Sequence, residues 1–539
     1  MKVLCGWVML GFLGAQVGWA QESPSRAMAA SVVSASEHRE VRKDEGVLLH
    51  GLAAEWHTTA DGQDFHFIQA AVDRSMARRT GEAESLEDVG LASSVLLVYR
   101  VTQQPKYYEA ARVLYGQLAT QGKMEGLGRY RLETFQAAYA ATFQQQKDFA
   151  GIAERLLMRG TDRTKMRGEY AMAFVDVLDW IPTDAPQRRA LVAALRRTMA
   201  AVAKTQNATT GLWSVSNGAE RDEEASADCA LVYAMAKGVR MGYLPQRYEG
   251  NARRGWEAIQ KKFGNATLAD RKDGRAVGTF LLAGSEMEQS ATEALGQGKT
   301  ALVDAWFNSQ TRKNAAGQTE LFHYKWDDDS NNGFSFFGRA FQRYGVKLVE
   351  ERMVPTAADL KKAQIYILAS PDIPSKNPNP HFMDAKSVDV IADWVRAGGV
   401  LLLMENDGPN SEFEHFNTLS ERFGIHFNAV IRNHVVGEDY AAGALMIPAG
   451  TGVFERSHRA YMKETSTISV KAPAKAALVD RGDVMIAVTK YGKGTVFAVV
   501  DPWVYNEYTD RRNHLPVEYD NFDAAIDLAG WAVRQSWLR

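Results

Sequence analysis

The chain of 539 residues has only two cysteines, Cys5 and Cys229, and no excess of charge of either sign. Cys5 lies in an N-terminal segment that we expect to be removed, so an intramolecular disulfide is excluded in the mature chain. Cys229 is interpreted as a small buried helix residue. The 63 basic and 65 acidic side chains give a net charge of −2, which does not indicate a nucleic-acid partner.

The first twenty residues have the pattern of a secretory signal peptide. Lys2 precedes the apolar run VLCGWVMLGFLGAQVGWA, which ends in small residues suited to cleavage after Ala20. No later apolar run is long enough to span a bilayer. We therefore expect the mature protein to be soluble and to act in the periplasm or outside the cell.

Residues 47–295 are predicted to be helical almost throughout. Apolar residues recur at intervals of three and four in FHFIQAAVDRSMA, VGLASSVLLVYRV, YAMAFVDVLDWI and CALVYAMAKGVRMGYL. Turn sequences such as TQQPKY and PTDAPQ separate these segments at the spacing of antiparallel helix hairpins. Such a series closes naturally into a ring of helix pairs. We assign residues 21–46 to a linker before it.

Residues 296–539 have the alternating pattern of an α/β domain. TALVDAWF, QIYILASP, GVLLLMEND and GTVFAVVDPW are expected strands, and DAKSVDVIADWVRAGG is an expected helix. This alternation predicts a mostly parallel sheet. The loop DDDSNNG is interpreted as a solvated turn and helix cap rather than a metal site.

Four segments of the helical half resemble unsaturated rhamnogalacturonyl hydrolases of glycoside hydrolase families 88 and 105. They are TGLWSVSNGAERDEEASADCALVYAMAKGVRMGYLP, YAMAFVDVLDWIP, GTFLLAGSEME and SLEDVGLASSVLLVYRVTQQPKYYEAARVLYGQL. The resemblance implies an (α/α)6 barrel, in agreement with the predicted helix pairs. It also implies an oligosaccharide substrate and no metal or organic cofactor.

The second half resembles the amidotransferase-like domain that is fused to some of these hydrolases. That resemblance implies a flavodoxin-like sheet of the class I amidotransferase type. However, no Gly-x-Cys-x-Gly elbow follows GVLLLMEND, and His415 has no cysteine partner in this half. Asp407, Glu412, Glu414 and His415 cluster after this strand. They could bind a sugar or an ion, although helix capping and solvation explain them more simply.

The family's implied reaction is hydration of the C4=C5 double bond of an unsaturated uronyl residue derived from pectin. An aspartic acid protonates the vinyl ether, water adds at C5, and the hemiketal opens. Such a step requires a strong acid held protonated by a partly apolar pocket.

The family acid stands in a Trp-Leu-Asp-Gly segment, which we compare with KMEGLGRYRLETFQAAYAATF. Without gaps its place is taken by Leu127, which cannot donate a proton. A shifted register places Glu133 there, at the cost of several matches and of the glycine. In the ungapped register, Glu133 is interpreted as a helix-surface or pocket-rim residue paired with Arg129.

A second family aspartate corresponds to SLEDVG in this chain. Glu87 aligns with it, and Asp88 could replace it after a small rotation of the helix. The same residues, following Ser85, also suit the start of a helix. Both interpretations remain open.

The family segment Arg-Gly-x-Gly-Trp-Tyr, which helps to hold the uronate, corresponds to KMRGEYAMAF. Lys165 or Arg167 supplies a cation for the carboxylate, whereas the tryptophan has become Glu169, whose charge would oppose uronate binding. Trp213, in TGLW, could stack a sugar ring or belong to the core.

Two hypotheses follow. The first is a secreted hydrolase of unsaturated uronyl oligosaccharides that acts through Glu87, Asp88 or Glu133. The second is a catalytically silent relative that binds uronate-bearing oligosaccharides or partner proteins.

Overall fold

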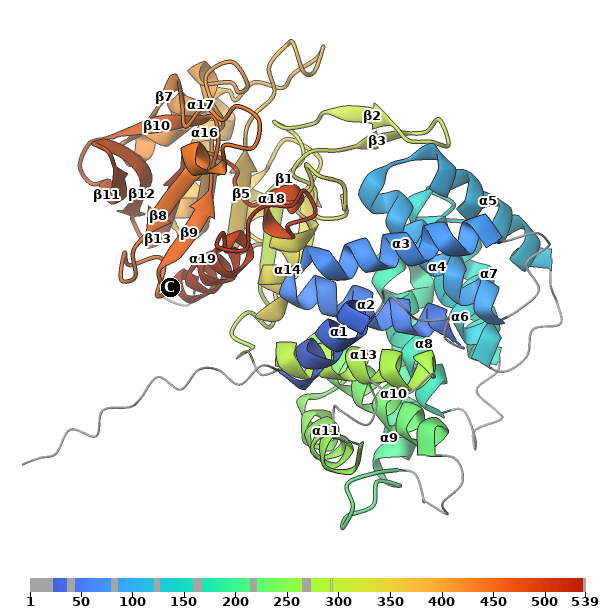
Figure 1. Ribbon diagram of the computed structural model, residues 1–539. Helices are drawn as coiled ribbons and strands as arrows, with labels where there is room; N and C mark the ends of the chain where they lie inside the picture. The colour runs from blue at the N-terminus through green and yellow to red at the C-terminus, as the bar shows by residue number, and fades with distance from the viewer. Residues whose placement is uncertain are drawn as a thin grey trace, which may run out of the picture.

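The structure, a computed structural model, describes residues 23–35, 44–78, 86–120, 127–158, 167–213, 221–263, 273–290, 292 and 294–536. The predicted signal peptide, residues 1–20, lies outside these ranges. The described chain forms a helical domain followed by an α/β domain (Figure 1). None of its helices combines the length and the apolar character that a membrane span requires.

Six helices of the described chain form a closed inner ring. In ring order they are α2 (Glu45–Thr59), α4 (Leu86–Thr102), α6 (Leu127–Thr142), α8 (Arg167–Trp180), α10 (Arg221–Arg240) and α13 (Gly274–Ser290). Each packs against the next, and α13 packs against α2, so the ring closes. The predicted helical barrel is confirmed.

Outer helices cover this ring. They are α1 (Pro24–Ser34), α3 (Gly62–Arg78), α5 (Pro105–Thr120), α7 (Asp148–Met158), α9 (Pro186–Ala203) and α11 (Glu249–Phe263), with a 3-10 turn η2 (Gln246–Tyr248) before α11. The expectation of a linker over 21–46 needs correction, because α1 lies within it. Met28, Ala29 and Val32 of α1 are buried, and the helix packs against α13, α2 and α3.

Glycines bring α2 close to both of its neighbours in the ring. A Cβ atom on Gly46 would lie 2.4 Å from the Cα atom of Gly90 in α4, and one on Gly278 of α13 would lie 2.2 Å from the carbonyl oxygen of Val47. These separations are too short for real carbon atoms, so any larger residue would force the helices apart. The glycines therefore set the close packing of the inner ring.

The α/β domain is built on a nine-stranded sheet with the order β4-β1-β5-β6-β13-β12-β10-β7, in which β11 also pairs with β12. The strands are β1 (Thr300–Asp304), β4 (Lys347–Glu351), β5 (Ile365–Ala369), β6 (Val400–Met404), β7 (Ile425–Arg432), β10 (Thr465–Val470), β11 (Lys475–Asp480), β12 (Asp483–Tyr491) and β13 (Gly494–Val499). Strands β4, β1, β5, β6 and β13 are parallel, and the others are antiparallel. Counted along the chain, the parallel strands lie in the order 2-1-3-4-5, which occurs in doubly wound α/β folds.

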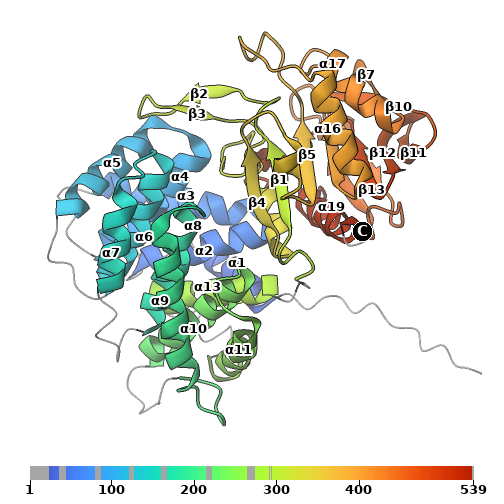
Figure 2. The ribbon, with the colours of Figure 1, turned by 180° about the vertical axis from the view of Figure 1, so that it is seen from behind.

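Helices cover both faces of this sheet. One face carries α14 (Ser335–Arg343) and α19 (Asn521–Gln535), and the other carries α16 (Ala385–Arg396) and α17 (Glu414–Ser420) (Figures 1 and 2). The remaining short elements are α15 (Ala357–Leu360), α18 (Asn506–Thr509), η3 (Glu421–Phe423), η4 (Tyr440–Gly443), and the two-stranded pairs β2 (Thr311–Lys313) with β3 (Thr319–Leu321) and β8 (Ala444–Ile447) with β9 (His458–Tyr461).

The two domains share one hydrophobic core, and the α/β domain closes one end of the ring. Trp56, near the end of α2, contacts Phe336 of α14 with ring centroids 4.9 Å apart. Arg100, near the end of α4, forms an ion pair of 2.8 Å with Asp329. The β2–β3 hairpin reaches over the barrel, where the loop between its strands meets α4 (Figure 1). The contact therefore involves the C-terminal ends of the inner helices.

Candidate active site

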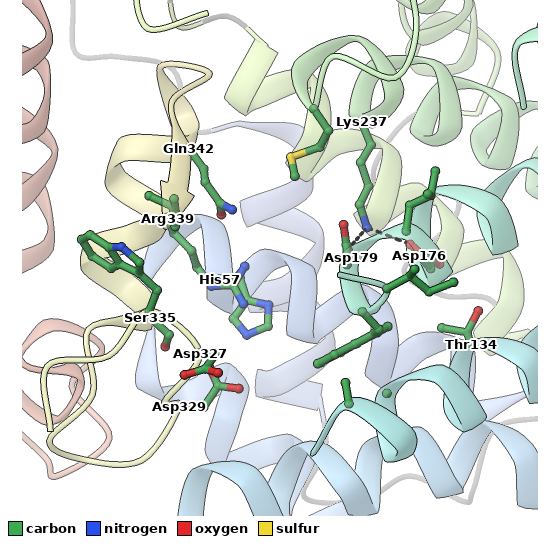
Figure 3. A pocket seen from close by; sticks show the side chains of 18 of the residues that line it. His57, Thr134, Asp176, Asp179, Lys237, Asp327, Asp329, Ser335, Arg339 and Gln342 are labelled. Carbon is green, nitrogen blue, oxygen red and sulfur yellow. Dashed lines mark hydrogen bonds and ion pairs between the residues drawn. The ribbon is translucent and has the colours of Figure 1, made fainter. Parts of the chain in front are cut away.

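A cavity of about 1760 Å³ runs through the centre of the ring and continues to the α/β domain. The inner helices line it along their length, and Arg339 and Gln342 of α14 line its far end (Figure 3). We call the part beside the starts of the inner helices, near Gly46, Arg131 and Glu169, the N-terminal end. The part near His57 and Arg339 is the interdomain end. Since a helix rises about 1.5 Å per residue, Gly46 and His57 of α2 lie roughly 16 Å apart along the helix.

Lys237 of α10 lies at the centre of a charge cluster on the cavity wall. Its ammonium group lies 2.8 Å from a carboxylate oxygen of Asp176 and 2.7 Å from one of Asp179, both on α8, and donates to the hydroxyl of Tyr233 at 2.8 Å (Figure 3). Tyr233 in turn donates to Asp176 at 2.6 Å. One cation is therefore shared by two carboxylates.

The environment of this cluster shifts the pKa values of its two carboxyl groups in opposite directions. Burial opposes the charge of Lys237, but the two aspartates outweigh it and raise the pKa of this ammonium group well above its usual range. Burial also opposes the charge of Asp176, yet Lys237 and its hydrogen bonds hold the pKa of that carboxyl below its ordinary value. For Asp179 the effect of burial is larger than that of Lys237, and it raises the pKa of this carboxyl group. Asp179 is the more accessible of the two, with about a third of its side chain (34%) exposed.

A second saturated pair lies beside the first. Arg240 of α10 donates to both carboxylate oxygens of Glu286 on α13, at 2.8 and 2.6 Å. Bidentate pairing of this kind is the strongest arrangement of a guanidinium and a carboxylate. This ion pair therefore links the neighbouring helices α10 and α13 of the ring.

The N-terminal end contains two further ion pairs. Arg131 of α6 lines the cavity and lies 3.4 Å from Asp44, just before α2. Glu169 of α8 also lines the cavity and is paired with Arg275 of α13. The expectation that Glu169 would repel a uronate therefore changes, because Arg275 compensates its charge.

Glu133 does not face the cavity. Its side chain is buried, and its carboxylate accepts hydrogen bonds of 2.7 to 3.0 Å from Arg155 of the outer helix α7. The interpretation of Glu133 as a surface or rim residue is corrected, because it lies between two layers of helices. It is also not placed to act as the acid.

Helical spacing shows which nearby positions belong to the cavity side of α6. Arg131, Thr134 and Ala138 line the cavity. Leu127 stands four and seven residues before the first two, so its position shares their stripe of the helix. Position 127 therefore belongs to the cavity side of α6, whereas Glu133 does not.

The same spacing separates Glu87 from Asp88 at the start of α4. Position 87 stands three and seven residues before Gly90 and Ser94, both of which line the cavity. Position 88 instead stands four residues before the buried Ala92, which does not line the cavity. The side chains of both residues lie outside the described part of the chain.

The predicted uronate contacts have different outcomes. Lys165 and the side chain of Arg167 lie outside the described residues. Trp213 is not a cavity residue: its ring packs against Gly255 of α11, and its indole N–H donates to the carbonyl of Val202 at 3.1 Å. The prediction that Trp213 stacks a sugar in the barrel is therefore replaced by a core role.

In the second domain, the acidic cluster after β6 contains a helix cap. The Glu412 carboxylate accepts the backbone N–H groups of His415 and Phe416 and thereby caps α17, as predicted. The interpretation of DDDSNNG as a solvated turn is wrong for Asp328 and Asp329, which are buried at the interdomain end. Within the described ranges no group of three or more His, Cys, Asp or Glu side chains is arranged to hold a metal ion.

Two residue spacings in the sequence point to the Lys237 cluster. Asp176 and Asp179 are spaced i,i+3 within YAMAFVDVLDWI, and Tyr233 and Lys237 are spaced i,i+4 within YAMAKGVR. Charged residues that interrupt otherwise apolar helices at these spacings share one face. Two such faces in an all-helical ring indicate facing partners. Cys229, by contrast, is buried in α10 as predicted.

Comparison with known proteins connects part of this site to glycoside hydrolases. Residues 166–300 match the family model Glycosyl Hydrolase Family 88, a range that includes the whole Lys237 cluster and the Arg240–Glu286 pair. This match supports the predicted resemblance for that part of the chain and a glycoside hydrolase-like function.

Three solved structures illustrate the similarity. A family 105 glycoside hydrolase of C. acetobutylicum ATCC 824 is 20% identical over 49% of this chain and 99% of its own, with a TM-score of 0.40. A glycosyl hydrolase of family 88 from Bacteroides vulgatus is 15% identical over 50% of this chain and 100% of its own, with a TM-score of 0.40. The mmIFT52 N-terminal domain is 18% identical over 44% of this chain and 97% of its own, with a TM-score of 0.33.

Proposed function

We propose that this protein takes unsaturated uronyl oligosaccharides into the N-terminal end of the barrel cavity and hydrates their C4=C5 double bond. The observation that carries the proposal is the position of Glu87 on the cavity-lining stripe of α4, since this residue aligns with a family aspartate. We do not assign that role to Glu133, because its carboxylate is paired with Arg155.

Arg131 supports an acidic substrate at this end. It is the cavity-lining cation of α6, the ring neighbour of α4, and its side chain is 18% exposed. A guanidinium at this place offers a planar fork to the uronate carboxylate. The proposed cations Lys165 and Arg167 precede or begin α8, the next helix of the ring, and would add to this charge.

In the proposed reaction, the carboxyl group of Glu87 donates a proton to C4 of the vinyl ether. Water adds at C5, and the hemiketal opens to release the rest of the sugar chain. Asp179 is not assigned this role, because its carboxylate is held by Lys237 at 2.7 Å.

The direct test is the loss of alkene absorbance when the purified chain acts on unsaturated rhamnogalacturonan disaccharide. A general acid contributes about 10²- to 10⁴-fold, so Glu87→Gln should reduce turnover by at least about 100-fold. Asp88→Asn is the matched control, one residue along the same helix and off the cavity stripe, and should stay within a few-fold of the parent. Equal losses in both variants would refute the assignment of Glu87.

The second candidate is the silent relative, and the place of Leu127 on the cavity stripe of α6 favours it. In that case calorimetry detects binding of the disaccharide, but the alkene absorbance does not change. Glu87→Gln then has no effect on turnover, because the parent protein has none. The two candidates thus differ in turnover and share binding.

We also propose export from the cytoplasm, based on the first twenty residues alone. N-terminal sequencing of the mature protein should give a start at Gln21. The resemblance of the second domain to amidotransferases remains a proposal about descent, and the order of its parallel strands supports it.

A further inference from the structure

The interdomain end of the cavity contains a cation that differs from all the others described above. Arg339 projects from α14 of the α/β domain toward the barrel (Figure 3). It makes no hydrogen bond or ion pair with any residue that the structure describes, and its Nε atom is buried without a partner. Its guanidinium carbon lies 6.0 Å from the centroid of the Phe336 ring.

Three neighbouring acids are already paired with other cations. Asp329 is bound by Arg100 at 2.8 Å, Asp179 by Lys237 at 2.7 Å, and Glu286 by Arg240. A buried Nε–H group without a partner is costly, because the protein does not replace the hydrogen bond that water would make. Burial accordingly lowers the pKa of Arg339 to about 10.

A second polar group without a partner lies beside it. His57, near the end of α2, has a buried Nε2 atom with no hydrogen-bond partner, and its ring lies 5.9 Å from that of Phe336. Burial, followed by the charge of Arg339, holds the pKa of His57 well below its usual range, so the ring is neutral. A neutral imidazole can donate one hydrogen bond without adding a second positive charge.

We propose that the interdomain end is a binding site for a single carboxylate group, held by Arg339 of the α/β domain and His57 of the barrel. The two residues come from different domains, so the site exists only when the domains are docked. It is separate from the substrate end assigned above and would operate equally in a catalytically silent protein.

Repulsion and geometry favour a carboxylate over a phosphate. Arg339 has no direct partner, because Asp329 and Asp179 are paired with other cations, so a single carboxylate can supply the missing contact. A dianion would bring a second charge close to Asp327 and Asp329, which line the same end. Carboxylates also match the planar fork of arginine in bidentate geometry. The ligand is therefore a uronic acid residue of a bound saccharide or a small organic acid.

Calorimetry on the full-length protein tests this assignment. Galacturonate is the acidic probe, galactose is its neutral counterpart, acetate tests a carboxylate without a sugar, and inorganic phosphate tests the dianion. We expect galacturonate to bind and galactose not to bind. Binding of acetate as well would identify a general organic acid site, and its failure would identify an acidic saccharide site. Preference for phosphate would overturn the proposal.

Two arginines of the same helix give a matched pair of variants. Arg339→Met should weaken galacturonate binding at least 10-fold. Arg343→Met, one turn further along α14, removes an arginine that contacts Glu288, Thr292 and Thr58 and does not line the cavity, so binding should persist.

Thermal unfolding of the same variants separates a ligand site from a structural role. Arg339→Met removes a cation whose buried Nε–H has no partner and thereby relieves a desolvation cost, so it should raise Tm by about 2 °C, whereas Arg343→Met should lower it. A parent-like affinity in Arg339→Met, or a loss of Tm equal to that of Arg343→Met, would refute the proposal. Neither result depends on whether Glu87→Gln abolishes turnover.

Discussion

The Lys237 cluster and Arg339 lie in the same cavity but differ in how their positive charge is compensated. Lys237 is surrounded by two carboxylates and a phenol hydroxyl, all within 2.8 Å. Arg339 has no such partner among the described residues, although it is also enclosed by protein. Both charges carry a desolvation cost, but only the first is offset by direct partners.

This difference suggests how to separate structural from ligand-binding charges in an enclosed site. A saturated cation connects helices and contributes to the closure of the ring. An unsaturated cation retains its hydrogen-bonding capacity for an external group. Substitutions should therefore affect stability in the first case and binding in the second.

The largest effect is expected for Lys237→Met. This change leaves Asp176 and Asp179 buried without their cation, and loss of one partner of a buried pair typically costs about 3–5 kcal/mol. Urea denaturation of the parent and the variant measures the free energy of unfolding. Adding Asp176→Asn to Lys237→Met should recover part of the loss, and a cost below about 1 kcal/mol would show that the cluster is not structural.

The pH dependence of His458 extends the comparison to a saturated cation outside the cavity. Its Nδ1 and Nε2 atoms lie 2.7 Å from Asp520 and 3.0 Å from Asp527. Burial opposes the charge, but the hydrogen bonds to these carboxylates outweigh it and raise the pKa of His458 from 6.5 to about 9.

Because the pKa is raised on folding, this stabilisation is fully present below pH 6.5 and is lost as the pH rises to about 9. The shift corresponds to a loss on the order of 3 kcal/mol across that window. Urea denaturation at several pH values measures it. His458→Gln should flatten this part of the profile, and an unchanged slope in the variant would contradict the assignment.

The smallest of these stability effects is expected for Glu133→Gln. Arg155 keeps a neutral partner and about a third of its side chain is exposed, so the loss should be about 1–2 kcal/mol. Turnover and binding should not change, because Glu133 lies outside the cavity. Arg155→Met serves as the control from the other partner. Loss of alkene consumption in Glu133→Gln would restore the shifted register.

The fold was largely predictable where the evidence is local. Apolar spacing predicted the helices of the barrel, and β-branched runs predicted the strands from β1 to β13 that form the parallel part of the sheet. The short helix α1 was missed because eleven residues carry few periods of the pattern. The burial of Asp328 and Asp329 was missed because a polar loop is solvated unless another domain covers it.

The site was less predictable than the fold. Glu133 and Leu127 lie on one helix, and the choice between them depends on which stripe faces the centre of the ring. The role of Arg339 had no local signal, since SFFGRAFQR resembles any amphipathic helix that places an arginine at its polar edge.

The sequence by itself determined that a helical half precedes an α/β half, because side-chain periodicity and turn chemistry act over a few residues. Only the tertiary structure decided which charges meet. Lys237 reaches α8 from a helix some sixty residues away, and Arg339 reaches a cavity built by another domain. Closure of the ring and docking of the two domains bring these groups together. A charge that meets a partner there stabilises the fold, and a charge without a direct partner is available to a ligand.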